Sequence, residues 1–389
     1  MTAARSLADG PVFTSREAGE ALRSVAALLR EAEYGEERAA GLLRAPSSGH
    51  LLSNPARYAF FSDHTRPAPA DAPPSVLTSL FLLNRAVPDL WVHAALKPEL
   101  TDLLQELALL TRSGDHYLGT ASLTPYRSRF FLSDRLFDNP APQQVVTRDA
   151  AELAMPPHAS SLLALDAVDR IDGSLLDVGC GSGFLALNAG PGCGRVAGFD
   201  LNPRSVRFSR ANALLNGRDV RFTVADFTDP TALGRAELGD TGRFGSLVFN
   251  SPTMPRIESD AGEFGQSTAR QVLRRTAAVA PYVLRPGGTA HVLTVVEVPR
   301  SAGSAREVVE GWLTGTHAAD VTVQEVDSPY LRVTERQLQD RRLDRQSLLS
   351  SGTAHAQQLL SALAARGTGS VVPVLVALRT SSTEGSRFP

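Results

Sequence analysis

Residues 175–183 constrain the fold of this chain more than any other stretch, because an apolar run leads directly into a glycine-rich turn. The run Leu175-Leu176-Asp177-Val178 is followed by Gly179-Cys180-Gly181-Ser182-Gly183. Such a run is typical of a buried parallel strand. The glycines let the chain turn sharply into a helix while a ligand approaches the backbone closely. The segment therefore predicts a strand, a turn and a helix with a nucleotide-like cofactor bound at the turn.

Three further apolar segments follow, over residues 195–200, 220–227 and 245–249, and each ends next to a residue that can bind a ligand. Asp200 lies about 20 residues beyond the glycine turn, where a ribose-binding carboxylate is expected. Asp226 is placed to accept from an adenine amino group, and Phe227 to cover the ring. The fourth strand runs into Asn250.

Residues 150–300 resemble the class I S-adenosylmethionine-dependent methyltransferases, in particular the small-domain group that methylates amino or amide nitrogens. The resemblance rests on the glycine turn and on three motifs that follow it, which are Asp200-Leu201-Asn202-Pro203, Asn212-Ala213-Leu214-Leu215-Asn216-Gly217 and Asp226. The Asn-Pro-Pro-Tyr/Phe motif of that group corresponds to Asn250-Ser251-Pro252-Thr253, in which two positions differ. A dinucleotide-dependent oxidoreductase would explain neither Asp226 nor this last motif.

The resemblance implies an α/β fold with a Rossmann-like, seven-stranded sheet and S-adenosyl-L-methionine as the cofactor. It implies that the cofactor is bound by residues of the turn and of the strand ends, namely Asp177, Gly179, Cys180, Gly181, Gly183, Asp200, Leu201, Asn202, Asp226, Phe227 and Asn250.

Catalysis is expected at Asn250, Ser251, Pro252 and Thr253. Methyl transfer from a sulfonium requires a nitrogen lone pair aligned with the methyl group. The Asn250 carbonyl can accept an N–H of the acceptor, and Pro252 stiffens the backbone so that the Ser251 carbonyl can join it. Thr253 cannot stack on a planar acceptor as an aromatic residue would, so it favours a small acceptor.

Four residues outside these motifs are candidates for binding the acceptor. Glu258 and Glu263 could hold a cationic amine or guanidinium by charge-assisted hydrogen bonds, although a solvated loop explains them equally well. His158 falls where related enzymes cover the methyl donor and could accept a proton, but a structural role is the stronger interpretation. Tyr126 could supply the stacking surface that Thr253 lacks.

The composition excludes several classes of function. A net charge of −2 over 389 residues argues against nucleic acid as a partner. The eight histidines are scattered without ligand spacing, so no metal is expected. The two cysteines fit a reducing cytoplasm, and neither a membrane span nor a signal peptide is indicated. We expect a cytoplasmic protein with a small-molecule acceptor that could form a homodimer.

The chain is predicted to contain two domains and a tail. Residues 1–145 are predicted to form a mainly helical, winged-helix-like domain for acceptor recognition, with a helix over 99–111 and a wing of strands over 117–123 and 129–133. Residues 146–380 form the catalytic domain, which includes a helical insertion over 329–367. Residues 381–389 are polar and predicted to be disordered.

The sequence leaves three functions open. The first is an N-methyltransferase acting on an amino, amide or guanidino nitrogen of a small molecule in natural product biosynthesis, with O-methylation still possible. The alternative is a methyltransferase of RNA base amino groups or of a protein glutamine amide in translation. A third is a binding module that retains the cofactor site without turnover.

Overall fold

The computed structural model describes residues 16–62, 73–148, 153–171, 173–229, 243–253, 268–316, 318–341 and 352–382. They group into two compact units. The first unit comprises residues 1–158 with 181–184 and 202–219, and the second comprises 159–180, 185–201 and 220–389. The first unit therefore includes part of the glycine turn and one helix from the predicted catalytic domain.

The second unit is built on a seven-stranded sheet with the order β10-β9-β8-β11-β12-β14-β13. Only β14 runs against its neighbours β12 and β13, and the other pairs are parallel. In chain order the strands are β8 (Gly173–Val178), β9 (Cys193–Asp200), β10 (Arg221–Val224), β11 (Phe244–Asn250), β12 (Leu284–Pro299), β13 (Asp320–Glu325) and β14 (Thr368–Arg379). This order confirms the predicted Rossmann-like α/β fold of seven strands. It also places a topological switch point at β8, beside which ligands bind in open α/β sheets.

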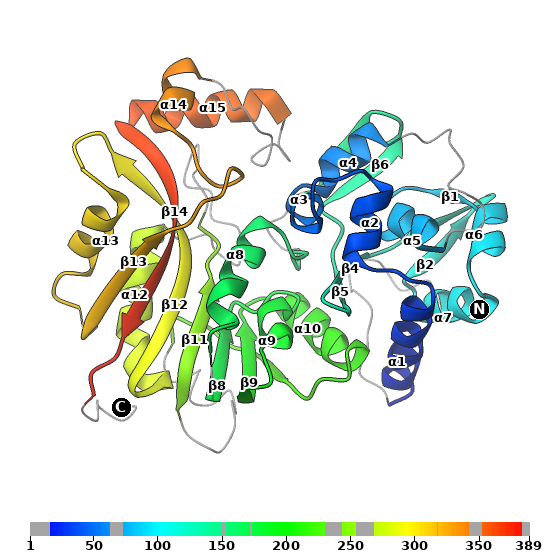
Figure 1. The fold of residues 1–389 in the computed structure, drawn as a ribbon, viewed down its shortest axis with the longest axis horizontal. Coiled ribbons are helices and arrows are strands. Elements are labelled where there is room, and N and C mark those ends of the chain that lie inside the picture. Colours follow the sequence, from blue (N-terminus) through cyan, green and yellow to red (C-terminus); the bar gives the residue numbers. More distant parts are fainter. Residues whose placement is uncertain are drawn as a thin grey trace. The chain divides into compact units, whose positions relative to one another are not determined.

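Helices α12 (Ala269–Val283) and α13 (Ala305–Leu313) pack on the sheet over a large apolar core, while α8 (Ala159–Val168) contacts β11 and β12 (Figure 1). A capping box between Thr268 and Gln271 fixes the start of α12. Helix α9 (Phe184–Asn188) follows the glycine turn directly. Strand β12 includes residues 285–288, and its pairing with β11 changes register between Phe244 and Ser246.

The predicted helical insertion contains two helices, α14 (Glu335–Asp340) and α15 (Gly352–Ala365). They pack near the start of β14 (Figure 1), where Leu338, Leu360 and Leu363 form a small core with Val371. Residues 342–351 lie between these helices, outside the described part of the chain, as do residues 383–389 of the predicted tail.

The first unit contains short helices and small sheets. Its helices are α1 (Arg16–Glu31), α2 (Glu36–Leu42), α3 (Ser48–Ser53), α4 (Pro55–Phe61), α5 (Pro73–Phe81), α6 (Asp89–Ala95), α7 (Pro98–Glu106) and α10 (Pro203–Leu215). Its strands are β1 (Val87–Pro88), β2 (Leu110–Ser113), β3 (His116–Gly119), β4 (Ser122–Tyr126), β5 (Arg129–Ser133), β6 (Phe137–Ala141) and β7 (Gln144–Thr147).

The predicted wing is present as the hairpin of β4 and β5, in which β5 has the predicted bounds but β4 covers residues 122–126 instead of 117–123. Strands β1, β3 and β2 form a separate antiparallel sheet. The helix predicted over residues 99–111 ends at Glu106, because Ala108 takes a left-handed conformation with φ of 53° and the chain enters β2 at Leu110. Periodicity alone did not show this break, since Leu109 and Leu110 continue the apolar pattern of the helix.

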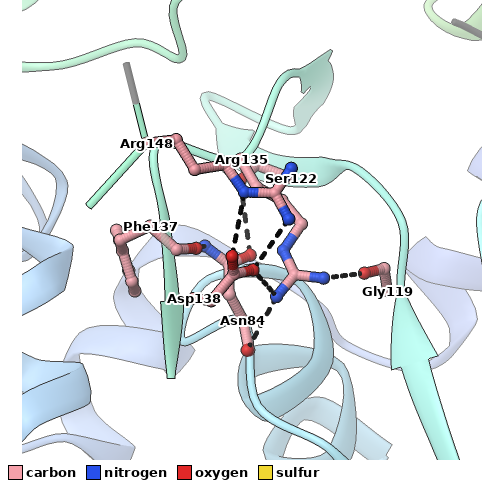
Figure 2. A network of polar contacts seen from close by, with 7 residues as sticks. All are labelled: Asn84, Gly119, Ser122, Arg135, Phe137, Asp138 and Arg148. Atoms are coloured by element: carbon pink, nitrogen blue, oxygen red, sulfur yellow. Dashed lines mark hydrogen bonds and ion pairs between the residues drawn. The ribbon is translucent and has the colours of Figure 1, made fainter. Parts of the chain in front are cut away.

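A buried polar network holds part of the first unit together (Figure 2). The Arg135 guanidinium donates to the carbonyl oxygens of Gly119 at 2.6 Å and Asn84 at 3.1 Å, and it pairs with Asp138 at 2.6 Å. Arg148 binds the same carboxylate from a more exposed position. Arg135 is therefore committed to internal contacts and is 8% exposed, so it does not contribute to a basic surface for nucleic acid.

Candidate functional site

The glycine turn has the backbone shape that its sequence predicts. Gly179, Gly181 and Gly183 have φ values of +61°, +54° and +78°, which favour glycine. A Cβ on Gly179 would lie 3.1 Å from the Phe249 ring, whereas a Cβ on Gly181 would meet no atom within 4 Å. Gly179 is exposed, so the backbone at the end of β8 is open to a ligand.

Asp177 lies on β8, just before the turn, with its side chain buried. Its Oδ2 accepts the N–H of Ala186 at 3.0 Å, near the start of α9. Burial raises its pKa to about 7, and the nearby charge of Asp200 adds to this rise, while the bond from Ala186 lowers it. Asp177 therefore ties the strand before the turn to the helix that follows it.

Two acids follow the next strands in the positions predicted for ligand binding. Asp200 ends β9, and its backbone carbonyl accepts the N–H of Ala225, just beyond β10. Asp226 comes next, half-buried, and its Oδ1 accepts the N–H of Thr228 at 2.6 Å. The Phe227 ring stacks on Phe199 with centroids 6.2 Å apart and meets Phe249 edge-on at 5.3 Å.

Several predicted cofactor residues have other roles in the structure. The Cys180 side chain is buried, and it would lie 3.1 Å from a Cβ on Gly198, so only its backbone is available to a ligand. Leu201 is 41% exposed. Asn202 is the N-cap of α10 and accepts the N–H of Arg204 at 2.8 Å. Gly181, Gly183 and Asn202 belong to the first unit.

Asn250 ends β11, and its amide is oriented by two serines that the sequence did not single out as site residues. Its Nδ2 donates to the Oγ of Ser160 at 3.0 Å and of Ser161 at 3.4 Å, both on α8. Among the described residues none donates to Oδ1. No sequence pattern links these serines, about 90 positions upstream, to Asn250, so only the packing of α8 on β11 shows them.

The residues after Asn250 form a network of hydroxyl groups. Ser251 Oγ donates to the Leu293 carbonyl at 2.8 Å and lies 3.0 Å from Thr253 Oγ1. Thr253 Oγ1 also bonds to Thr294 Oγ1 at 2.7 Å and accepts from the Val295 N–H at 3.2 Å. Thr253 is 4% exposed. Its side chain is thus an anchor to β12.

The Ser251 carbonyl already has a partner, because it accepts the Thr253 N–H at 2.7 Å. Pro252, between them, is exposed. The turn fixes the backbone of residues 251–253, and the Ser251 carbonyl can assist Asn250 only through its second lone pair.

Two of the predicted acceptor residues, Tyr126 and His158, belong to the first unit, where the Tyr126 ring lies 5.1 Å from that of Phe184. Burial lowers the pKa of His158. Glu258 and Glu263 lie outside the described residues. Within the described ranges, no cluster of histidine, cysteine or acidic side chains could hold a metal, and no helix is long and apolar enough to cross a bilayer.

The residues at the strand ends fit an adenosyl sulfonium ligand. Asp200 and Asp226 provide half-buried carboxylates at two adjacent strands, which suit ribose hydroxyls and an exocyclic amine. Phe227 presents an aromatic ring next to them, and the exposed backbone at Gly179 admits close approach. Two carboxylates, an aromatic ring and an open backbone are the groups that a nucleoside ligand requires.

Comparison with known proteins agrees with this geometry. Residues 156–237 match the family model described as ribosomal protein L11 methyltransferase. A protein of Methanocaldococcus jannaschii, provisionally named a protein N5-glutamine methyltransferase, is 27% identical over 150 residues, which cover 36% of this chain and 72% of that protein. The release factor glutamine methyltransferase of Deinococcus radiodurans is 33% identical over 163 residues, covering 37% of this chain and 54% of the relative.

One solved structure that matches part of the chain is the geranyl diphosphate C-methyltransferase of Streptomyces coelicolor in complex with Mg²⁺, geranyl diphosphate and S-adenosyl-L-homocysteine. It has a TM-score of 0.36 and 18% identity, and the alignment covers 57% of this chain and 78% of that one.

The strand order, the motifs and the sequence matches together place the catalytic unit among the class I S-adenosylmethionine-dependent methyltransferases. S-adenosylmethionine is accordingly the cofactor of this unit.

Proposed function

We propose that this class I methyltransferase methylates the side-chain amide nitrogen of glutamine in a protein of the translation apparatus. The observation that carries the proposal is the orientation of Asn250, whose Nδ2 is held by Ser160 and Ser161. Support comes also from the two relatives described above, whose names place their activity on protein glutamine. Such an acceptor fits the cytoplasmic location expected from the sequence.

The Asn250 amide can act as an acceptor of hydrogen bonds at the site of reaction. With Nδ2 donating to the serines, Oδ1 points away from α8 and can accept an N–H of the substrate amide. This bond would fix the direction of the nitrogen lone pair and increase its electron density. Because Asn250 lies at the end of β11, next to β8, the bond would form beside the cofactor.

When bound, the cofactor would supply an electrophilic methyl group on a sulfonium. The acceptor nitrogen would form the new N–C bond, the electron pair of the broken C–S bond would stay on sulfur, and one N–H proton would pass to solvent. Asn250 Oδ1 stabilises the positive charge that develops on nitrogen until that proton leaves. The hydroxyl network of Ser251 and Thr253 holds the loop beside it in one shape.

A small-molecule amine or amide remains the second candidate. It is favoured by the absence of an aromatic ring at position 253, where the resembled group stacks a planar acceptor. The named relatives give no support to a role in natural product biosynthesis, and they favour a protein acceptor.

The test is to incubate the protein with methyl-labelled S-adenosylmethionine and host extract separated into protein, RNA and small-molecule pools. We expect label in a protein, with mass spectrometry showing one added methyl group on a glutamine. Label confined to small molecules or to RNA would overturn the protein acceptor.

Asn250→Ala is expected to lower kcat by about 10²–10³-fold, as for loss of one charge-stabilising contact in the transition state. A matched control is Gln324→Ala, which removes an exposed amide from β13 in the same unit. Equal activity of the Asn250 and Gln324 variants would remove Asn250 from the mechanism.

A further inference from the structure

Two asparagines, Asn212 on α10 and Asn216 at its C-cap, bind the edge of β5 that does not pair with β4. Asn216 Oδ1 accepts the N–H of Phe130 at 2.9 Å, and its Nδ2 donates to the Phe130 carbonyl at 2.7 Å. In the same way, Asn212 Oδ1 accepts the N–H of Leu132 at 2.7 Å, and its Nδ2 donates to the Leu132 carbonyl at 2.8 Å. Each amide thus replaces a neighbouring strand for one residue of β5.

Asn212 makes one bond that Asn216 does not. Its Nδ2 also donates to the carbonyl oxygen of Ser182 at 2.8 Å, within the glycine turn. Asn212 is fully buried, and Ser182 is 3% exposed. Both hydrogens of the Asn212 amide are therefore used, one on the hairpin and one on the turn.

A second, independent contact joins the same hairpin to the same segment. Phe184 follows the last glycine of the turn, and its ring lies 4.9 Å from that of Phe131 on β5 and 5.1 Å from that of Tyr126 on β4. A hydrogen bond from the Asn212 side chain and an aromatic cluster thus both hold residues 182–184 against the β4–β5 hairpin.

We propose that Asn212 is a positioning residue for methyl-donor binding. Its amide bonds both to the Ser182 carbonyl in the glycine turn and to Leu132 in β5, and so it holds the turn in a fixed position relative to β5. The residues in αL conformation on both sides of Ser182 have a soft backbone, so an external bond decides which shape the turn holds. A fixed turn presents its backbone to the donor without a cost of ordering on binding. The inference concerns the donor and is independent of the acceptor's identity.

The experiment measures the Kd of S-adenosylmethionine by calorimetry and the Tm of two variants, Asn212→Ala and Asn216→Ala. Each variant loses the two hydrogen bonds of one asparagine side chain to β5, so each is expected to have a lower Tm. Only Asn212→Ala is expected to raise Kd, by about tenfold, which is the effect of one lost hydrogen bond in a buried site. The same rise in both variants, or no rise in either, would reduce Asn212 to a structural role.

A variant that keeps Asn212 covers the case in which Asn212→Ala does not fold. Phe184→Leu weakens only the aromatic contact between the turn and the hairpin. We expect it to raise the Kd by a smaller factor than Asn212→Ala. An unchanged Kd in the folded Phe184→Leu protein would count against the hairpin as the support of the turn.

Discussion

Both units have apolar interiors, but the first unit adds more buried polar contacts to this packing than the second. In the second unit, strands and helices meet through aliphatic and aromatic side chains that form one continuous core. In the first unit, buried polar side chains bind backbone groups of other segments, as Arg135 does with Gly119 (Figure 2). Asn212 binds Leu132 in a similar way. A buried carboxylate, Asp134, is likewise paired with Arg204 through two hydrogen bonds.

This difference predicts which kind of substitution destabilises each unit most. Apolar packing loses stability in proportion to the atoms removed, whereas a buried polar contact leaves its partners unsatisfied when one member is lost. Four variants test this comparison.

The largest effect is expected in the apolar core of the sheet. Leu247 is fully buried on β11, between β8 and β12. Leu247→Ala removes its contacts and leaves a cavity, and it should lower the free energy of unfolding by about 3–5 kcal/mol. Urea denaturation measures the change. A loss below about 1 kcal/mol would show that this core can collapse around the cavity.

Arg135→Met tests the polar interior of the first unit. It leaves the carbonyl oxygens of Gly119 and Asn84 without their donor and removes one partner of Asp138. We expect a loss of about 2–4 kcal/mol of unfolding free energy. Arg148→Met is the matched control, because Arg148 binds the same carboxylate with its side chain 44% exposed, and it should cost about 0–1 kcal/mol. Equal losses would erase the distinction between the buried and the exposed arginine.

Thr253→Val tests whether a polar contact in the second unit behaves like those of the first. The change keeps the side-chain volume but leaves Thr294 Oγ1 and the Val295 N–H without the Thr253 oxygen. We expect thermal denaturation to show a loss of about 1–2 kcal/mol, and Thr253→Ser to retain most of the stability. A Thr253→Val protein as stable as the wild type would mean that the network contributes nothing to stability.

Asp177→Asn tests the buried carboxyl of β8 through the pH dependence of stability. Its pKa in the folded chain, about 7, lies above the ordinary value of 3.8, so the native state binds more protons between these values. The contribution of Asp177 is therefore fully present at acidic pH and is lost as pH rises through about 7. Relative to the Asn variant, the unfolding free energy of the wild type should fall by at most about 1.4 kcal/mol per pH unit across this range. Parallel stability curves from pH 4.5 to 7.5 would contradict the raised pKa.

Much of the second unit could be predicted, because short stretches of sequence encode its strands and its glycine turn. Parallel strands that are covered on both faces need uninterrupted apolar runs, and the glycines of the turn mark φ values that other residues avoid. The order of Asp177, Asp200, Asp226 and Asn250 along the chain therefore predicts four successive strand ends. The strand order of the sheet confirms the fold that the motifs imply.

The parts that could not be predicted depend on contacts between distant segments. Thr253 was interpreted by what it lacks, an aromatic ring, whereas its partners Thr294 and Val295 lie over 40 positions away. Ser160 and Ser161 became relevant only when α8 was placed against β11. The first strand of the predicted wing, residues 117–123, spans parts of β3 and β4, because an apolar run does not show where one strand ends and the next begins.

Local backbone preferences and the period of apolar residues encode the sheet, the glycine turn and the acids at the strand ends, so these features are visible in the sequence. The orientation of the Asn250 amide, the burial of Thr253 and the partners of Asn212 depend on how distant segments pack. A polar side chain can bond to many groups, and the fold selects among them by bringing particular donors and acceptors within reach.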